Sequence, residues 1–373
     1  MKARARLFRT RHPFNIQATD NLFVEAIREN VSYHYTHCKL YQSILKKLHF
    51  SPDELRDIQD LAKLPFLPTV LFKKYRFFSM PEWCIPIKAT SSGTKEQFSY
   101  IGLDWGSLLC GLHMVIRIAK WRNLLSFYPT NYVILGYQPH KSNQMAVMKT
   151  AYGATLFAPA LHRCYALQYR NGSYVPDLES VMKHLKQFGK KKFPVRFMGF
   201  PSYTYFLLKL MDQCNIHIPL PKHSKIMLAG GWKQFYTEQI DKQTLYDLIK
   251  RILNVDEENV IEFFGAVEHP IMYCDCPKHH FHVPVYSRVI IRDVHTLEPV
   301  PNGTIGLVNL LTPLTEAVPI TSIMTDDLGI LHDGKNCGCG LESPYLEIIG
   351  RVGLKDIRTC AAGATELLEE RTV

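Results

Sequence analysis

The stretch that decides the fold lies near the middle of the chain and reads Lys225-Ile226-Met227-Leu228-Ala229-Gly230-Gly231-Trp232-Lys233. In it a short apolar run ends in two adjacent glycines. Short apolar runs between turn residues are typical of buried strands, and glycines at a strand end let a ligand approach the backbone. The stretch predicts a buried strand with a binding site at its carboxyl end, although a tight turn with a packed tryptophan would have the same sequence.

Similar apolar runs occur at 132–135, 195–198 and 260–264, and segments of helical period at 202–214 and 237–253 lie between them. This alternation predicts layered α/β sheets with parallel pairing. Before it, apolar residues at helical spacing predict a helix from Asp20 to about Tyr35, and Ser51-Pro52-Asp53-Glu54 predicts the start of a second helix. We predict four parts: an N-terminal helical region packed on the core (1–85), an α/β core (86–268), a small β-rich subdomain (269–350) and a mobile tail (351–373).

Composition excludes several classes of protein. Of 373 residues, 46% are hydrophobic, 12% aromatic and 21% charged, which is enough apolar material for a packed interior and excludes a disordered chain. No apolar run approaches the roughly 18 residues of a membrane helix. The start of the chain lacks an export signal, so we expect a cytoplasmic protein whose ten cysteines are mostly reduced.

The charge is unevenly distributed. The 44 basic and 34 acidic residues leave a net charge of +10, and five basic residues precede the first acid, Asp20: Lys2, Arg4, Arg6, Arg9 and Arg11. We interpret this start as a solvated arm. Binding of nucleic acid or of an acidic partner is the alternative, but a basic run at a terminus is weak evidence for it. We therefore predict no nucleic-acid partner and no membrane span.

A run of hydroxyls around a glycine, Thr90-Ser91-Ser92-Gly93-Thr94-Lys95, can bind phosphate. Gly93 permits close approach of the backbone, the hydroxyls donate hydrogen bonds and Lys95 supplies positive charge. It is not a Walker loop, and a run of this kind can also be a simple turn. The next residue, Glu96, could repel ATP, so a degenerate enzyme that has lost its activity is an alternative.

Two further motifs supply carboxylates. Phe263-Phe264-Gly265-Ala266-Val267-Glu268 ends a strand and delivers Glu268, which could hold Mg²⁺ while an aromatic residue beside it stacks on a purine. Thr325-Asp326-Asp327-Leu328-Gly329 offers adjacent carboxylates, one of which could accept hydrogen bonds from ribose hydroxyls. A polar turn before a strand is the alternative.

In this order the four motifs resemble those of the adenylate-forming superfamily of acyl and aryl ligases. The resemblance implies that Thr90 to Lys95 bind the ATP phosphates, that Gly230 and Gly231 line the adenine pocket, that Phe264, Gly265 and Glu268 serve adenine and Mg²⁺, and that Thr325 and Asp327 hold ribose. Ile349-Gly350-Arg351 is similar to the superfamily's Gly-Arg element, whose arginine contacts the nucleotide. Lys233 becomes a candidate contact to the carboxylate or phosphate.

Within the superfamily the chain resembles the acyl-protein synthetases of the LuxE type, over most of its length. Only 22 residues follow Arg351, so we do not expect the C-terminal lid domain of the CoA ligases. Asp356-Ile357-Arg358-Thr359-Cys360 is similar to the family segment whose cysteine receives the acyl group. A thiolate suits attack on an acyl-AMP, and Lys355 and Arg358 favour the thiolate form.

One set of cysteines and histidines departs from the pattern of the LuxE-type enzymes of luminescence. It consists of Cys274, Cys276, His279, His280, His282, Cys337 and Cys339. It resembles the zinc knuckle of relatives of phenylacetate-CoA ligase. We expect a structural Zn²⁺ held by Cys276, His282, Cys337 and Cys339, with Cys274 and His280 as substitutes, and unliganded cysteines are the alternative.

These observations predict an ATP-dependent enzyme that adenylates a carboxylic acid, takes the acyl group onto Cys360 and delivers it to a partner protein such as a reductase. A fatty or an aryl acid suits the apolar segments near Leu135-Gly136-Tyr137 equally well. One alternative is a ligase that passes the acyl group to CoA, an amine or a carrier protein. Another is a binding protein that is stabilised by zinc and that binds nucleic acid through its basic N-terminal residues.

Overall fold

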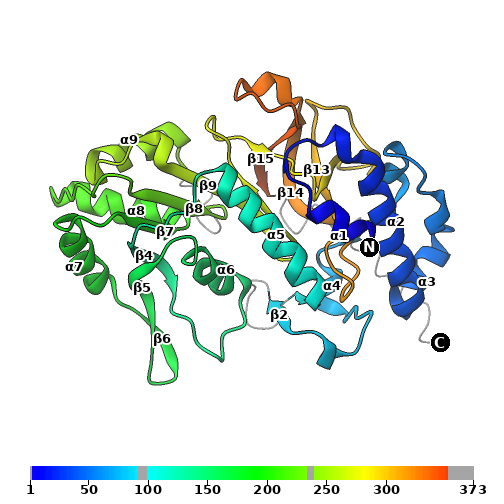
Figure 1. The fold of residues 1–373 in the computed structure, drawn as a ribbon, viewed down its shortest axis with the longest axis horizontal. Coiled ribbons are helices and arrows are strands. Elements are labelled where there is room, and N and C mark those ends of the chain that lie inside the picture. Colours follow the sequence, from blue (N-terminus) through cyan, green and yellow to red (C-terminus); the bar gives the residue numbers. More distant parts are fainter. Residues whose placement is uncertain (1, 91–98, 233–238, 352–373) are drawn as a thin grey trace. The chain divides into compact units, whose positions relative to one another are not determined.

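The computed structural model describes residues 2–90, 99–232 and 239–351 (Figure 1). Contacts between Cα atoms divide the chain into two compact units. Unit 1 comprises residues 1–118 and 265–373, and unit 2 comprises residues 119–264. The division into four parts at 85, 268 and 350 stays a prediction.

Unit 2 is built on a sheet with the strand order β10-β9-β8-β7-β4-β5-β6, in which β10 (His269–Cys274) is contributed by residues assigned to unit 1. The pairs β9-β8, β8-β7, β7-β4 and β4-β5 are parallel, and the edge strand β6 is antiparallel to β5. The strands are β4 (Thr130–Tyr137), β5 (Ala160–Arg170), β6 (Ser173–Pro176), β7 (Val195–Gly199), β8 (Lys225–Ala229) and β9 (Val260–Ala266). All four apolar runs that were predicted to be strands lie in β4, β7, β8 and β9. The predicted parallel α/β layering is confirmed.

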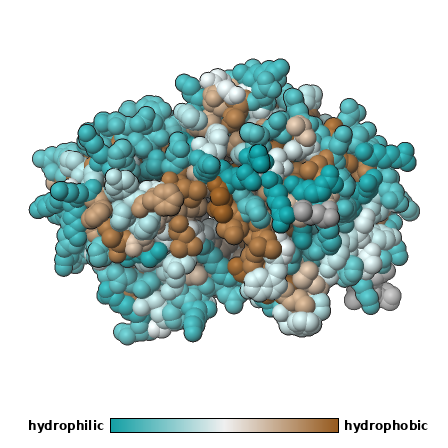
Figure 2. All heavy atoms as spheres, in the orientation of Figure 1, coloured by the Kyte–Doolittle hydropathy of each residue, from teal (hydrophilic) through white to brown (hydrophobic). Residues whose placement is uncertain are grey.

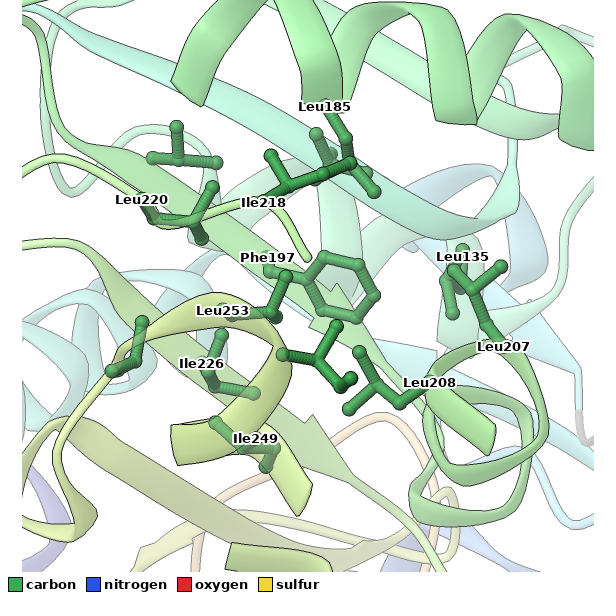
Figure 3. Packing of buried hydrophobic residues seen from close by; sticks show 14 of the residues in the cluster. Leu135, Leu185, Phe197, Leu207, Leu208, Ile218, Leu220, Ile226, Ile249 and Leu253 are labelled. Atoms are coloured by element: carbon green, nitrogen blue, oxygen red, sulfur yellow. The ribbon is translucent and has the colours of Figure 1, made fainter. Parts of the chain in front are cut away.

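Helices with one apolar face cover this sheet. They are α6 (Ala146–Ala154), α7 (Leu178–Gly189), α8 (Pro201–Gln213) and α9 (Lys242–Leu253), with a 3₁₀ turn at Glu257–Asn259. Phe197 of β7 and Ile226 of β8 are partners in register and belong to one buried cluster with Leu208 of α8 and Leu253 of α9 (Figure 3). Burial of such side chains stabilises the unit by about 1.5–3 kcal/mol each.

Unit 1 contains an antiparallel sheet with the order β11-β15-β14-β13-β12, and β1 pairs with β14 in parallel. The strands are β1 (Leu67–Pro68), β11 (Phe281–His282), β12 (Arg288–Arg292), β13 (Ile305–Leu311), β14 (Ser322–His332) and β15 (Tyr345–Arg351). The hairpin β2 (Ile87–Thr90) and β3 (Tyr100–Leu103) and the strand β10 (His269–Cys274) complete the strands that the structure describes in this unit. The β-rich pattern expected after Glu268 is confirmed.

The helices described in unit 1 are mostly N-terminal: α1 (Ala3–Phe8), α2 (Asp20–His37), α3 (Lys39–Lys47), α4 (Leu71–Lys74) and α5 (Trp105–Trp121), whose last turn enters unit 2. Short 3₁₀ turns occur at Gln17–Thr19, Pro52–Glu54, Gln59–Lys63, Glu82–Cys84 and Gly334–Cys337. The helix predicted from Asp20 is confirmed as α2, which buries its apolar stripe. Among the described residues, we find no helix with the length and apolarity to cross a membrane.

The basic start is not the solvated arm that its charge predicted. Leu7 and Phe8 of α1 are fully buried, and the Arg4 side chain is nearly so. The Arg4 guanidinium lies 3.6 Å from Asp104 Oδ2 and 3.5 Å from Glu316 Oε2, and it donates to the Leu314 carbonyl. The prediction was wrong because the apolar residues between the cations pack into unit 1.

The prediction that a second helix begins at Ser51 was also wrong. Ser51 and Glu54 form the expected capping box, with Asp53 N donating to Ser51 Oγ and Ser51 N donating to Glu54 Oε1. The helical turn nevertheless stops after Glu54, where Leu55 takes ψ 89° and buries its side chain. The capping residues at Ser51 start one helical turn, and the chain then leaves the helical conformation because Leu55 is buried in the core.

Candidate functional site

Two motifs that lie 24 residues apart in the sequence meet in unit 1. Asp327 of β14 is the register partner of Arg351, the last residue of β15, and Arg351 Nε donates to Asp327 Oδ1 over 3.1 Å. Burial and the neighbouring Asp326 raise the pKa of Asp327, and Arg351 opposes that shift. A ligand hydroxyl that donates to Asp327 would therefore stabilise its ionised form.

Thr325 shapes the backbone ahead of this pair. Its hydroxyl donates to the Val308 carbonyl and accepts from Asp327 N. The pairing of β14 with β13 is irregular here, since Leu307 lies opposite Leu328 and Asn309 lies opposite Met324. The threonine thus fixes the strand, while Asp327 is the residue with an ionisable group to offer.

Glu268 lies just beyond β9 and is 7% exposed. Burial raises the pKa of its carboxyl and Asp326 adds to that shift, while a hydrogen bond with Ser99 and the charge of Lys73 oppose it. A buried carboxylate of this kind gains stability from a cation. Glu268 fits the Mg²⁺ role that the sequence predicts for it.

The sequence did not single out Thr69, Lys73 or Ser99 as site residues. The parallel pairing of β1 with β14, at Leu67 opposite Ile323, brings Thr69 Oγ1 within 3.4 Å of Asp326 Oδ1. The two residues are 257 positions apart, and no spacing rule could have joined them. The resemblance of the chain to the LuxE-type synthetases over most of its length was the one signal available.

The glycine pair occupies a second place, in unit 2. Gly230 follows β8 and has φ +80°, and a Cβ there would lie 2.8 Å from Phe200 Cε1, so only glycine fits. Gly230 N donates to the Phe263 carbonyl over 3.3 Å, which places the exposed Gly230 and Gly231 beside the end of β9, where Phe264 and Gly265 lie. The neighbouring Trp232 is buried and contacts Tyr205, so it is a core residue.

Several predicted site residues lie outside the described residues. They are Ser91, Ser92, Gly93, Thr94 and Lys95 of the phosphate loop, Lys233, and Cys360. Thr90, which precedes the loop, ends β2 and pairs with Tyr100 of β3. The loop therefore connects the two strands of this hairpin.

A group of four sulfur and nitrogen ligands is assembled elsewhere in unit 1. One ligand atom from each of Cys276, His282, Cys337 and Cys339 lies within 4.8 Å of all the others. Cys276 Sγ is 3.5 Å from Cys337 Sγ, and His282 Nε2 is 3.2 Å from Cys339 Sγ. Ligands of a tetrahedral zinc lie roughly 3.3–3.8 Å apart, so the donor set fits Zn²⁺. Cys274, at the end of β10, is not part of this group.

The surroundings orient these ligands. His282 Nδ1 donates to the Ser343 carbonyl over 2.6 Å, which leaves Nε2 to face the cysteines. Lys278 N donates to Cys276 Sγ, and Gly338, with φ +71°, turns the chain between Cys337 and Cys339. Burial and the adjacent thiols Cys339 and Cys276 raise the pKa of Cys337, a penalty on the thiolate that a metal ion would reverse.

Comparison with known proteins gives the same assignment. The family model described as "Acyl-protein synthetase, LuxE" matches residues 7–369. The chain is 26% identical over 351 residues to the long-chain-fatty-acid--luciferin-component ligase of Aliivibrio fischeri, which covers 92% of this chain and 88% of that protein. It is 23% identical over 317 residues to the phenylacetate-coenzyme A ligase of Aromatoleum evansii, covering 82% of this chain and 65% of that enzyme.

Among solved structures, 2-hydroxyisobutyryl-CoA ligase in complex with 2-HIB-AMP superposes with a TM-score of 0.69 at 14% identity. The match covers 92% of this chain and 70% of that one. At this identity the likeness concerns the fold alone. The fold is the large domain of the adenylate-forming enzymes, as the motif order predicted.

Proposed function

The chain belongs to the LuxE family of acyl-protein synthetases, and from this premise we propose that it activates a fatty acid with ATP and carries the acyl group on Cys360. As an acid-thiol ligase of the adenylate-forming class, it works through an acyl-adenylate. The observation that carries the proposal is the pairing of Asp327 with Arg351 in the unit that also holds the buried Glu268.

In the first half-reaction a carboxylate oxygen of the acid attacks the α-phosphorus of ATP, and pyrophosphate leaves. Asp327 accepts hydrogen bonds from the ribose hydroxyls, and Arg351 holds its carboxylate in place. Glu268 would hold Mg²⁺, which offsets the charge that builds on the phosphates. Residues 90–95 donate hydrogen bonds to the same oxygens, and Lys233 contacts the acid or the phosphate.

Gly230, Gly231 and Phe264, which belong to unit 2, line the adenine pocket together with the next residue, Gly265. The support is local: φ at Gly230 excludes a side chain, so the backbone between β8 and β9 stays open to a flat ring. Phe264 is half-buried and offers an aromatic face for stacking.

In the second half-reaction the Cys360 thiolate attacks the carbonyl carbon of the acyl-AMP. The bond from that carbon to the phosphate oxygen breaks, AMP leaves, and a thioester remains on the protein. Cys360 lies nine residues after Arg351, so its tether begins at a residue that contacts the nucleotide site. The acyl group then passes to a partner protein such as a reductase.

The Cys/His group has a structural role in this proposal. Four protein ligands leave no open position for chemistry. A Zn²⁺ held by them would join the turn at 276–282 to the turn at 337–339, and β11 pairs with β15, which ends at Arg351. The metal thereby supports the strand that carries the nucleotide contact.

The test is to incubate the protein with ATP, Mg²⁺ and radiolabelled fatty or aryl acids, and to ask whether label remains on the denatured chain and is released by hydroxylamine. We expect label on the wild type and on Cys214→Ser, an exposed cysteine that serves as control, and none on Cys360→Ser. Acid-dependent release of pyrophosphate without label would move the acyl group to CoA, an amine or a carrier protein. Silence in both assays would reject the proposal.

A further inference from the structure

Helix α5 is apolar on two faces, and only one of them is covered. Its inner face, with Cys110, Met114 and Ile118, is buried. On the other side Trp105, Leu109, Leu112 and Ile116 are 69%, 61%, 55% and 46% exposed. We call these four residues the α5 stripe. A helix that is apolar all round is normally buried all round, and none of the residues that the structure describes covers the stripe.

The α5 stripe has the geometry of a helix-pairing seam. Its spacings of four, three and four residues are those of alternating d and a positions in a heptad repeat, and they keep the four side chains within about 60° of arc. Figure 2 shows the apolar atoms running along the place that α5 has in Figure 1. The seam is about 16 Å long, which suits a partner helix of some eleven residues.

Charge decides which helix fits. Trp105 to Trp121 contain no acid, and His113, Arg117 and Lys120 lie along one edge of the stripe. A second copy of α5 would bring cations against cations, which disfavours self-pairing. The occupant that fits has an apolar face and an acidic one.

The chain itself has such a segment beyond the described residues. In residues 361–371 a helical projection groups Ala361, Ala364, Thr365 and Leu368 on one side and Glu366, Glu369 and Glu370 on the other. The segment is eleven residues long, matching the stripe. The nine residues that join it to Arg351 span up to about 30 Å.

We propose that residues 361–371 dock as an amphipathic helix on the α5 stripe, with their glutamates facing the basic edge. The docking places the residue before this segment, Cys360, on unit 1 at a high local concentration. That consequence rests on the proposed function, whereas the docking does not.

Amide hydrogen exchange of residues 361–371 in the full chain tests the proposal without ATP or acid. We expect exchange at least about tenfold slower than in a random coil, and a return to the coil rate in Leu112→Asp. Leu178→Asp, an equally exposed leucine on α7, is the matched control and should keep the protection. Both sites are exposed, so circular dichroism should report intact folds.

A charge variant gives a second readout. Lys120→Glu should speed exchange of the segment, the added change Glu369→Lys should restore it, and Lys186→Glu on α7 should have no effect. Coil-like exchange in the wild type, or protection that survives Leu112→Asp, overturns the proposal. Concentration-dependent self-association through α5, or capture by another protein that leaves the segment unprotected, overturns it as well.

Discussion

Arg351 Nε donates to Asp327 Oδ1 over 3.1 Å, and the two residues lie opposite each other on β15 and β14. The pair connects the acid proposed to hold ribose to the residue at which the Cys360 segment begins. Asp327 has a raised pKa because it is buried, although Arg351 counteracts the shift. The ionised acid thus depends on its partner and on any ligand that donates to it.

Removing the charge of Asp327 should weaken nucleotide binding. We expect Asp327→Asn to raise the KM for ATP by about 10- to 100-fold, since a charged hydrogen-bond acceptor contributes about 1.5–3 kcal/mol. Acid-dependent pyrophosphate exchange measures the change. Asp333→Asn, at a carboxylate that caps a 3₁₀ turn in unit 1, is the control and should leave the KM unchanged. An unaltered KM in Asp327→Asn would remove this residue from the site.

Glu268→Gln should separate stability from activity. The folded-state pKa of Glu268 is raised, so the fold favours the protonated carboxyl. The resulting contribution to the free energy of unfolding is fully present below the unfolded-state pKa, and it is lost as the pH rises through the folded-state pKa. At pH 7, which is above the ordinary pKa of glutamate, the raised folded-state pKa therefore makes the wild type less stable than a chain with a neutral side chain at this position. We expect Glu268→Gln to raise Tm at pH 7 in the absence of Mg²⁺, with the difference vanishing below about pH 4, near the ordinary pKa of glutamate.

The same substitution should lower adenylation by about 100-fold and abolish stabilisation by Mg²⁺ with ATP, because the proposed ligand is lost. Thermal melts over pH 4–8 with and without Mg²⁺, together with pyrophosphate exchange, measure both effects. A variant with full activity, or one that melts lower than the wild type at pH 7, contradicts the proposed role. Glu262→Gln, in β9 but paired with Lys242, is the control.

The part of the fold that sequence could predict is local. The runs at 195–198 and 225–228 are apolar enough to identify strands, and Gly230 has a φ that other residues rarely adopt. Pairing between distant segments was not predictable. The contact between Thr69 and Asp326 depends on the two-residue strand β1, which has no pattern of its own.

The candidate site divides in the same way. Motif likeness identified Asp327, Arg351 and Glu268, but their contacts come from the sheet. At the N-terminus the charge pattern was misleading, because burial of Leu7 and Phe8 outweighs the exposure that five cations suggest. Chain charge indicates the partners of a surface, and it does not determine which apolar residues pack beneath that surface.

Loss of one Cys/His ligand should release the metal and destabilise unit 1. We expect about one Zn²⁺ per chain by atomic emission in the wild type and less than about a tenth of that in Cys337→Ser, with a lower Tm. Cys274→Ala tests which cysteines are the ligands. Because Cys274 lies outside the four-ligand group, this variant should keep the metal. Zinc loss in Cys274→Ala, or a metal-free wild type with an unchanged melt after chelation, would contradict the assignment.

The buried start of the chain yields the last prediction. Arg4→Ala leaves Asp104 and Glu316 facing each other without their shared cation, and Asp104 is only 7% exposed. Breaking a buried ion pair by removing one partner costs about 3–5 kcal/mol, and the remaining hydrogen bonds to Asp104 from Ser107 and Glu316 N keep the effect near the lower end. Urea unfolding at pH 7 measures the loss. Arg11→Ala, at an exposed position, should change the free energy of unfolding by less than about 0.5 kcal/mol. Equal effects of the two substitutions would mean that the start of the chain is the solvated arm after all.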